Sequence, residues 1–144
     1  MVGNRLPRIQ ALILLALAAG CFWRSYGPHL ATHTDVLVGI ARKGADLVGG
    51  GRLTAESMPE LTYPLERAVA FADRAEARSG EAPPPSLLAF RGLVARYREF
   101  VDALDRVRRS HGASEARAEL AAPLAAVEAA AAEVHRALDA EGRT

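Results

Sequence analysis

Residues 86–109 read SLLAFRGLVARYREFVDALDRVRR, and this stretch decides the fold. Its large apolar residues recur every three or four positions, which is the spacing of one face of an α-helix. They are Leu87, Phe90, Leu93, Val94, Tyr97, Phe100, Val101, Leu104 and Val107. Ser86 is a fitting N-cap, and Gly112 is the expected stop. The pattern predicts a long amphipathic helix with a charged, solvated outer face.

Two more helices are expected before this one. The first runs from about residue 29 to 48, and the glycines at 49–51 end it, because glycine adopts the left-handed cap conformation without strain. Gly44 lies on its apolar face and allows a neighbouring helix to approach closely. A short helical turn at 55–61 then precedes a helix at 63–78.

The last expected helix begins near Ser114 and carries an apolar stripe that continues to Leu138. Pro123 lies inside this stripe, and an interior proline costs about 3 kcal/mol or kinks the helix. We therefore expect a bend near residues 119–122. Residues 142–144 are expected to be a frayed end.

The composition agrees with an all-α protein. Half of the 144 residues are apolar, 24% are charged and only 6% are aromatic, and the chain is rich in alanine and arginine, both strong helix formers. Four amphipathic helices joined by short connections predict one antiparallel four-helix bundle over residues 29–141. The net charge of +1 gives no reason to expect a nucleic-acid partner.

The N-terminus has the layout of a targeting segment. Arg5 and Arg8 precede an apolar run from Ile9 to Ala19, and small residues follow it. A positive start, a short apolar middle and a small-residue exit are typical of a secretory signal peptide. Even when extended to Trp23 the run falls short of the roughly 20 residues that cross a bilayer, so a short retained anchor helix is the weaker alternative.

The end of this segment, Leu17-Ala18-Ala19-Gly20-Cys21, resembles the lipobox of bacterial lipoproteins. The resemblance covers only the first 21 residues. It implies that the Cys21 thiol receives diacylglycerol and that the chain is cleaved between Gly20 and Cys21. The usual pattern prefers leucine three positions before the cysteine, where this sequence has Ala18.

Residues 21–28 are expected to form a lipidated tether. Phe22 and Trp23 beside Arg24 suit the membrane interface, and Gly27-Pro28 is expected to break the chain. In enteric bacteria an aspartate directly after the lipidated cysteine signals retention in the inner membrane. Phe22 occupies that position here, so the resemblance favours the outer membrane, facing the periplasm.

Candidates for chemistry are few. His29 and His33 share a helix face and are weak candidates for a metal site, but no third ligand can be assigned. Met58 and His135 are the only loose candidates for haem ligands, and a solvated histidine or a pair with Asp139 is the more ordinary role for His135. With a single cysteine, a multi-cysteine zinc or iron–sulfur site is excluded. We expect no metal and no cofactor.

The stretch from Met58 to Glu66 is the least generic part of the helical region. Met58, Pro59, Tyr63 and Pro64 are interpreted as a helix-entry structure and as a possible contact segment for a partner.

We find no catalytic constellation in the sequence and expect a non-enzymatic, lipid-anchored envelope protein with a structural or protein-interaction role. Its expected partners are the membrane, through Cys21, and an envelope protein that the sequence does not name. The alternative is a small ligand or metal carrier that uses the bundle interior or His29 and His33.

Overall fold

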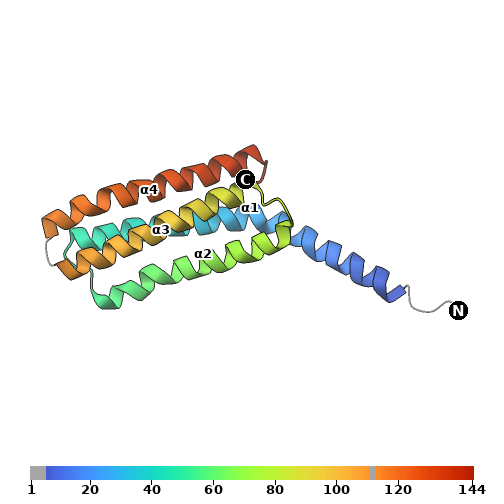
Figure 1. Cartoon of the computed structure of the whole chain (residues 1–144), viewed down its shortest axis with the longest axis horizontal. Coiled ribbons are helices and arrows are strands. Elements are labelled where there is room, and N and C mark those ends of the chain that lie inside the picture. Colours follow the sequence, from blue (N-terminus) through green and yellow to red (C-terminus); the bar gives the residue numbers. More distant parts are fainter. Residues whose placement is uncertain (1–5, 111–112) are drawn as a thin grey trace.

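The computed structural model describes residues 6–110 and 113–144, and every regular element in them is helical. The order is α1 (Leu6–Gly49), the 3-10 turn η1 (Ala55–Ser57), α2 (Met58–Ser79), α3 (Pro85–Ser110) and α4 (Ala113–Ala140). Figure 1 shows the four helices packed side by side with successive helices running in opposite directions, and the first part of α1 projects from one end. The predicted all-α, antiparallel four-helix bundle is confirmed.

We call the end from which α1 projects the proximal end, and the end with η1 the distal end (Figure 1). α1 and α3 contact each other, and both contact α2 and α4. The predicted stripe of α3 forms the centre of the core, because all nine of its large apolar residues are buried. Full burial of one such side chain contributes about 1.5–3 kcal/mol, so this stripe stabilises the bundle more than any local propensity does.

Two features of the first helix match the sequence. The chain leaves α1 at Gly49, and Gly51 takes the left-handed conformation with φ 64°. Gly44 is buried, and a Cβ built on it would lie 3.0 Å from Leu104 Cδ1 and 3.4 Å from Leu61 Cδ2. The close helix approach predicted at Gly44 is therefore present.

The expected break at Gly27-Pro28 is wrong, because α1 continues through both residues. Tyr26 and Leu30, on either side of the proline, are fully buried, and this burial offsets the roughly 3 kcal/mol that an interior proline costs. Gly27 helps, because it has no Cβ to clash with the proline ring. Residues 22–28 therefore belong to the bundle, which does not begin at His29 and has no flexible tether in front of it.

The second and third helices also begin differently from expectation. α2 starts at Met58, with Pro59 in its first turn, so Pro64 lies inside the helix and not at its start. Ser86 is not an N-cap, because it lies within α3 after Pro85 and is fully buried. The expected stop at Gly112 lies outside the described residues.

The fourth helix runs unbroken through Pro123 to Ala140. Leu120 and Val127, one on each side of the proline, are buried in the core, and this packing holds the helix together. The chain after it is not frayed. Gly142 takes φ 65°, and the Arg143 N–H donates to Leu138 O at 2.9 Å, so the tail folds back against the bundle.

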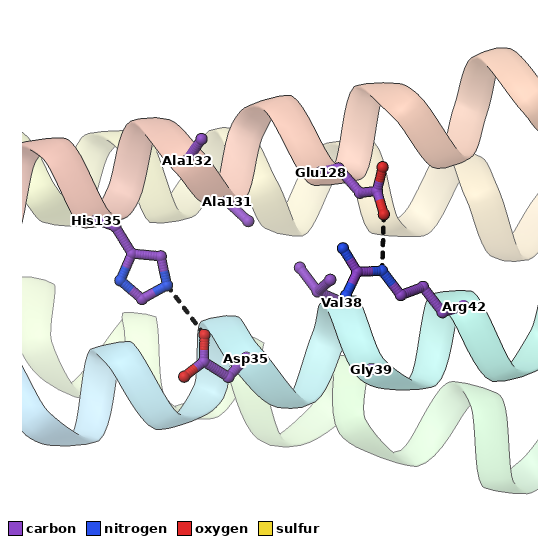
Figure 2. Close-up of a pocket in the computed structure, with 8 residues that line it drawn as sticks. All are labelled: Asp35, Val38, Gly39, Arg42, Glu128, Ala131, Ala132 and His135. Atoms are coloured by element: carbon purple, nitrogen blue, oxygen red, sulfur yellow. Dashed lines mark hydrogen bonds and ion pairs between the residues drawn. The ribbon is translucent and has the colours of Figure 1, made fainter.

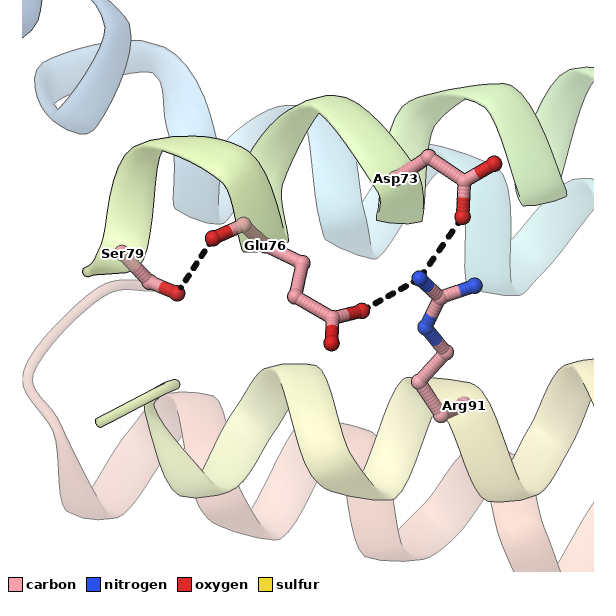
Figure 3. Close-up of polar contacts among 4 residues, drawn as sticks. All are labelled: Asp73, Glu76, Ser79 and Arg91. Atoms are coloured by element: carbon pink, nitrogen blue, oxygen red, sulfur yellow. Dashed lines mark hydrogen bonds and ion pairs between the residues drawn. The ribbon is translucent and has the colours of Figure 1, made fainter. Parts of the chain in front are cut away.

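Ion pairs tie the helices together on the surface. Arg91 of α3 reaches across to α2, where its Nη2 lies 2.7 Å from Asp73 Oδ1 and also bonds Glu76 (Figure 3). The Ser79 hydroxyl donates to Glu76 O at 2.8 Å and closes the last turn of α2. Exposed pairs of this kind contribute about 0–1 kcal/mol each, so they set register more than stability.

Candidate functional site

The projecting part of α1 is the most unusual surface of the molecule (Figure 1). Six of its large apolar side chains are 54–68% exposed: Ile9, Leu12, Ile13, Leu14, Leu15 and Leu17. By length and composition α1 is long and apolar enough to cross a membrane, and only 6% of its most apolar stretch is buried. A signal sequence near an N-terminus has the same properties. Among the described residues, these six form an apolar surface that the bundle does not cover.

Cys21 lies where this segment meets the bundle. Its thiol is free and its residue is exposed, whereas the next residue, Phe22, is already half-buried against the core. The Ser25 hydroxyl donates to the carbonyl oxygens of Cys21 and Phe22, at 3.2 and 3.1 Å. Among the residues whose burial the structure describes, every buried core residue comes after Cys21.

Aromatic and arginine side chains form a cluster at the part of α1 just after Cys21. We call this cluster the collar and define it as Phe22, Trp23 and Tyr26 of α1 together with Arg78 and Arg143. The Phe22 and Trp23 rings lie 5.3 Å apart, and the Trp23 and Tyr26 rings 4.9 Å apart. The Arg78 guanidinium lies over Phe22 at 4.5 Å, and that of Arg143 lies over Trp23 at 5.1 Å. Cations over aromatic faces at these distances are attracted by the ring quadrupole, so the last turn of α2 and the C-terminal tail are both held on α1.

A buried polar cluster lies directly beneath the collar. The Ser86 N–H and hydroxyl donate to the two oxygens of Glu141, both at 2.8 Å. Since the only hydroxyl proton of Ser86 is used there, the Tyr26 hydroxyl donates to Ser86 Oγ over 3.0 Å. Burial, its largest cause, raises the pKa of Tyr26. The cluster joins α1, α3 and the C-terminal tail at the proximal end.

The two candidate metal ligands on α1 have different surroundings. His29 is exposed, and His33 is half-buried with its ring 4.8 Å from that of Phe71. Burial lowers the pKa of His33, and the positive charge of the neighbouring Arg67 lowers it further. Within residues 6–110 and 113–144, no three His, Cys, Asp or Glu side chains are grouped to hold a metal ion.

A groove of about 440 Å³ lies between α1 and α4. Two polar contacts bridge it, as Figure 2 shows: the ion pair from Arg42 Nε to Glu128 Oε1 at 2.7 Å, and the hydrogen bond between His135 Nε2 and Asp35 Oδ1 at 2.9 Å. His135 therefore pairs with α1, where the sequence suggested Asp139 of its own helix. Small and aliphatic residues line the rest: Val38, Gly39, Ala131 and Ala132.

The segment with the paired prolines forms the first turns of α2, at the distal end (Figure 1). Met58 is half-buried against the core, and Tyr63 is 57% exposed. Arg67 donates to the Tyr63 hydroxyl at 3.0 Å and lies over its ring. The fold does not bring this segment near the two histidines or the cysteine in any contact that we find within the described residues.

The comparisons with known proteins give no family. No family model, no curated protein and no solved structure matches this chain.

Sequence reasoning missed the collar and the polar cluster. A signal for the α1 part exists, because Trp23, Tyr26 and Leu30 continue the three-and-four spacing of the first helix backwards through the proline. No signal exists for Arg143 or Glu141, since only the helix packing brings Arg143 to Trp23, 120 positions earlier, and Glu141 to Ser86, 55 positions earlier.

Proposed function

We propose that this chain is a lipid-anchored helical-bundle protein of the bacterial cell envelope, with a structural or protein-interaction role. One observation carries the proposal: an exposed apolar helical segment ends at an exposed cysteine that directly precedes the first core residues. Lipidation at Cys21 would place the bundle at the membrane surface. Several acyl chains hold a protein firmly, whereas a single chain binds only marginally.

The interior of the bundle is filled with packed side chains, which supports a function carried by its surface. Tyr97, Phe90 and Phe100 fill the centre of the bundle and are fully buried. Each neighbouring helix contributes further apolar side chains to the same core. The exposed helix faces are therefore the surfaces that we propose for contacts with other envelope proteins.

A retained helical anchor is the second candidate, and the continuity of α1 favours it. The helix passes through Gly20 and Cys21 without interruption. A chain that kept residues 1–20 would hold the bundle on an uncleaved hydrophobic helix. Both candidates place the proximal end at a membrane and differ in the covalent state of Cys21.

Labelling with a clickable fatty acid tests the proposal in cells of a bacterial host. We expect label on the wild-type chain and a mature mass that begins at Cys21 with acyl chains added. Cys21→Ser is expected to lose the label and the cleavage. Ser25→Ala is the matched control, because it removes a hydroxyl one turn later and leaves the thiol in place.

The fractionation of the variants separates the candidates. A Cys21→Ser chain that still moves entirely with membranes, together with an unlabelled and uncleaved wild-type chain, would contradict lipidation and support the retained helix. A wild-type chain that is soluble and unlabelled would contradict both. Separation of inner and outer membranes then tests the expected outer-membrane location.

A further inference from the structure

We propose that the proximal end of the bundle binds anionic phospholipid headgroups through Arg24 and Arg78, with the charge of Arg143 beside them. The proposal rests on the membrane anchoring proposed above and adds a lipid-binding surface to it. It holds for either form of the anchor, because the membrane reaches the residue before Phe22 in both: through acyl chains on Cys21 in the lipidated form, and through the apolar helix before Cys21 in the retained form.

The continuous helix fixes the depth of the collar. α1 rises about 1.5 Å per residue, and no break separates the projecting segment from residues 22–26. The headgroup region on one side of a bilayer is roughly 5–7 Å thick. In a chain that keeps the segment, if residues up to Ala19 lie in hydrocarbon, Phe22 and Trp23 follow about 4.5 and 6 Å further along the axis and lie in that region, and Arg24 lies at its outer edge.

The fold then carries two more arginines to the same depth. Arg78 comes from the last turn of α2 and lies 4.5 Å over the Phe22 ring. Arg143 comes from the C-terminal tail and lies 5.1 Å over the Trp23 ring. Any membrane that surrounds the two rings therefore also meets both guanidinium groups. Aromatic side chains with neighbouring arginines are typical of membrane interfaces.

Two arginines at this end leave room for phosphate. Arg24 and Arg78 are exposed, and within the described residues neither has an ion-pair partner. Arg143 bonds Glu141 through Nε at 3.2 Å, and its Nη1 is buried, so the paired donors for phosphate come from Arg24 and Arg78. A guanidinium offers paired N–H donors that match two phosphate oxygens.

Acids at the same end limit the strength of the preference. Glu81 and Asp139 are exposed there, whereas Glu76 and Glu141 are already bonded to Arg91 and Ser86. The placement of arginines on the rings, more than the net charge, therefore favours an anionic lipid. A basic residue at an anionic membrane surface contributes about a fivefold preference.

The single tryptophan of the chain provides the probe, because Trp23 is itself part of the collar. The full-length protein is reconstituted in mixed vesicles of phosphatidylglycerol and phosphatidylcholine, with bromine atoms on one lipid or on the other. Quenching of Trp23 by each brominated lipid gives the preference for phosphatidylglycerol next to the collar. We expect a preference of about fivefold or more for the wild-type chain.

Two double variants make the test specific. Arg24→Gln with Arg78→Gln is expected to bring the preference close to one. Arg98→Gln with Arg106→Gln removes the same charge from exposed positions of α3 outside the collar, and it is expected to leave the preference unchanged. Circular dichroism checks that both variants remain helical.

Three outcomes would overturn the inference. One is a wild-type preference close to one, and another is an unchanged preference in the Arg24/Arg78 variant. The third is that neither brominated lipid quenches the fluorescence of Trp23, although the protein floats with the vesicles. Those three leave the anchoring intact, whereas a protein that fails to float with vesicles would contradict the anchoring as well.

Discussion

Replacing Gly27 by alanine is expected to release the C-terminal tail from the bundle. A Cβ at position 27 would lie 2.0 Å from Arg143 O and 2.9 Å from Arg143 Cβ, far inside van der Waals contact. The obstacle is backbone, and it is held in place because the Arg143 N–H donates to Leu138 O. α1 is equally fixed by Tyr26, which is fully buried beside it. The tail must therefore move away.

The cost can be worked out from the contacts that the tail makes. Moving it weakens the bonds from Ser86 to the Glu141 carboxylate, and bonds to a charged group contribute about 1.5–3 kcal/mol. It also removes Arg143 from the Trp23 ring, at about 0.5–1 kcal/mol. The usual gain in helix propensity over glycine is absent here, because the alanine Cβ also meets the ring of Pro28. The net destabilisation expected for Gly27→Ala is about 2–4 kcal/mol.

Urea unfolding of the chain from Cys21 onward, which contains the whole buried core, measures this loss. Helicity is followed by circular dichroism and the collar by Trp23 fluorescence. Gly39→Ala is the control in the same helix, because a Cβ there has no atom within 4 Å, and it is expected to stabilise by about 0.5–1 kcal/mol. A Gly27→Ala chain that unfolds at the same urea concentration as wild type, or a higher one, would refute the reasoning.

Three further predictions concern the core. Gly44→Ala places a Cβ 3.0 Å from Leu104 Cδ1, so overpacking of about 1–3 kcal/mol outweighs the gain in helix propensity, and thermal melting is expected to show a lower Tm. Tyr97→Phe removes the hydroxyl that donates to Leu61 O at 2.6 Å, and the loss of this buried hydrogen bond costs about 0.5–1.5 kcal/mol in urea unfolding. Burial lowers the pKa of His33 below 6.5, so the unfolded chain binds this proton more readily. The contribution of His33 to stability is then full above about pH 6.5 and falls as the pH drops below it. The free energy of unfolding of His33→Gln should lack this pH dependence. If the variant keeps it, His33 is not its cause.

The helices that could be predicted are those whose apolar stripe is long and whose ends carry clear signals. The apolar stripe of α3 correctly predicted the burial of every large residue in it. Residues with three-and-four spacing share one face of a helix, and an apolar face of this kind packs against the core. Gly49 and Gly51 marked the end of α1 correctly, since a left-handed residue needs no tertiary partner. The tight approach at Gly44 followed from its place on the buried face.

The errors share one physical cause. Pro28 was interpreted as part of a break and Pro64 as a helix start, yet both lie inside continuous helices. A proline costs about 3 kcal/mol locally, which is similar to the gain from burying one large side chain on each side of it. A local rule cannot decide such a balance, because the burial depends on neighbours that are distant in the sequence.

The candidate site also has one part that the sequence predicts and another that depends on tertiary packing. Cys21 and the apolar segment before it stand next to each other in the chain, so the pattern alone was enough to single them out. The arginines of the collar come from α2 and from the tail, and nothing near them in the sequence distinguishes them from the other arginines. Their role depends on the packing of α1 against two other parts of the chain.

The sequence by itself determined the helical class, the number of bundle helices and the special position of its one cysteine. These properties follow from short-range periodicity and composition, which the chain carries wherever it folds. Only the tertiary structure decided that α1 passes through Gly27-Pro28 into the core and that the tail closes over it at Arg143. Both depend on contacts between residues far apart in the chain, and burial of Tyr26 and Leu30 provides the free energy that holds them.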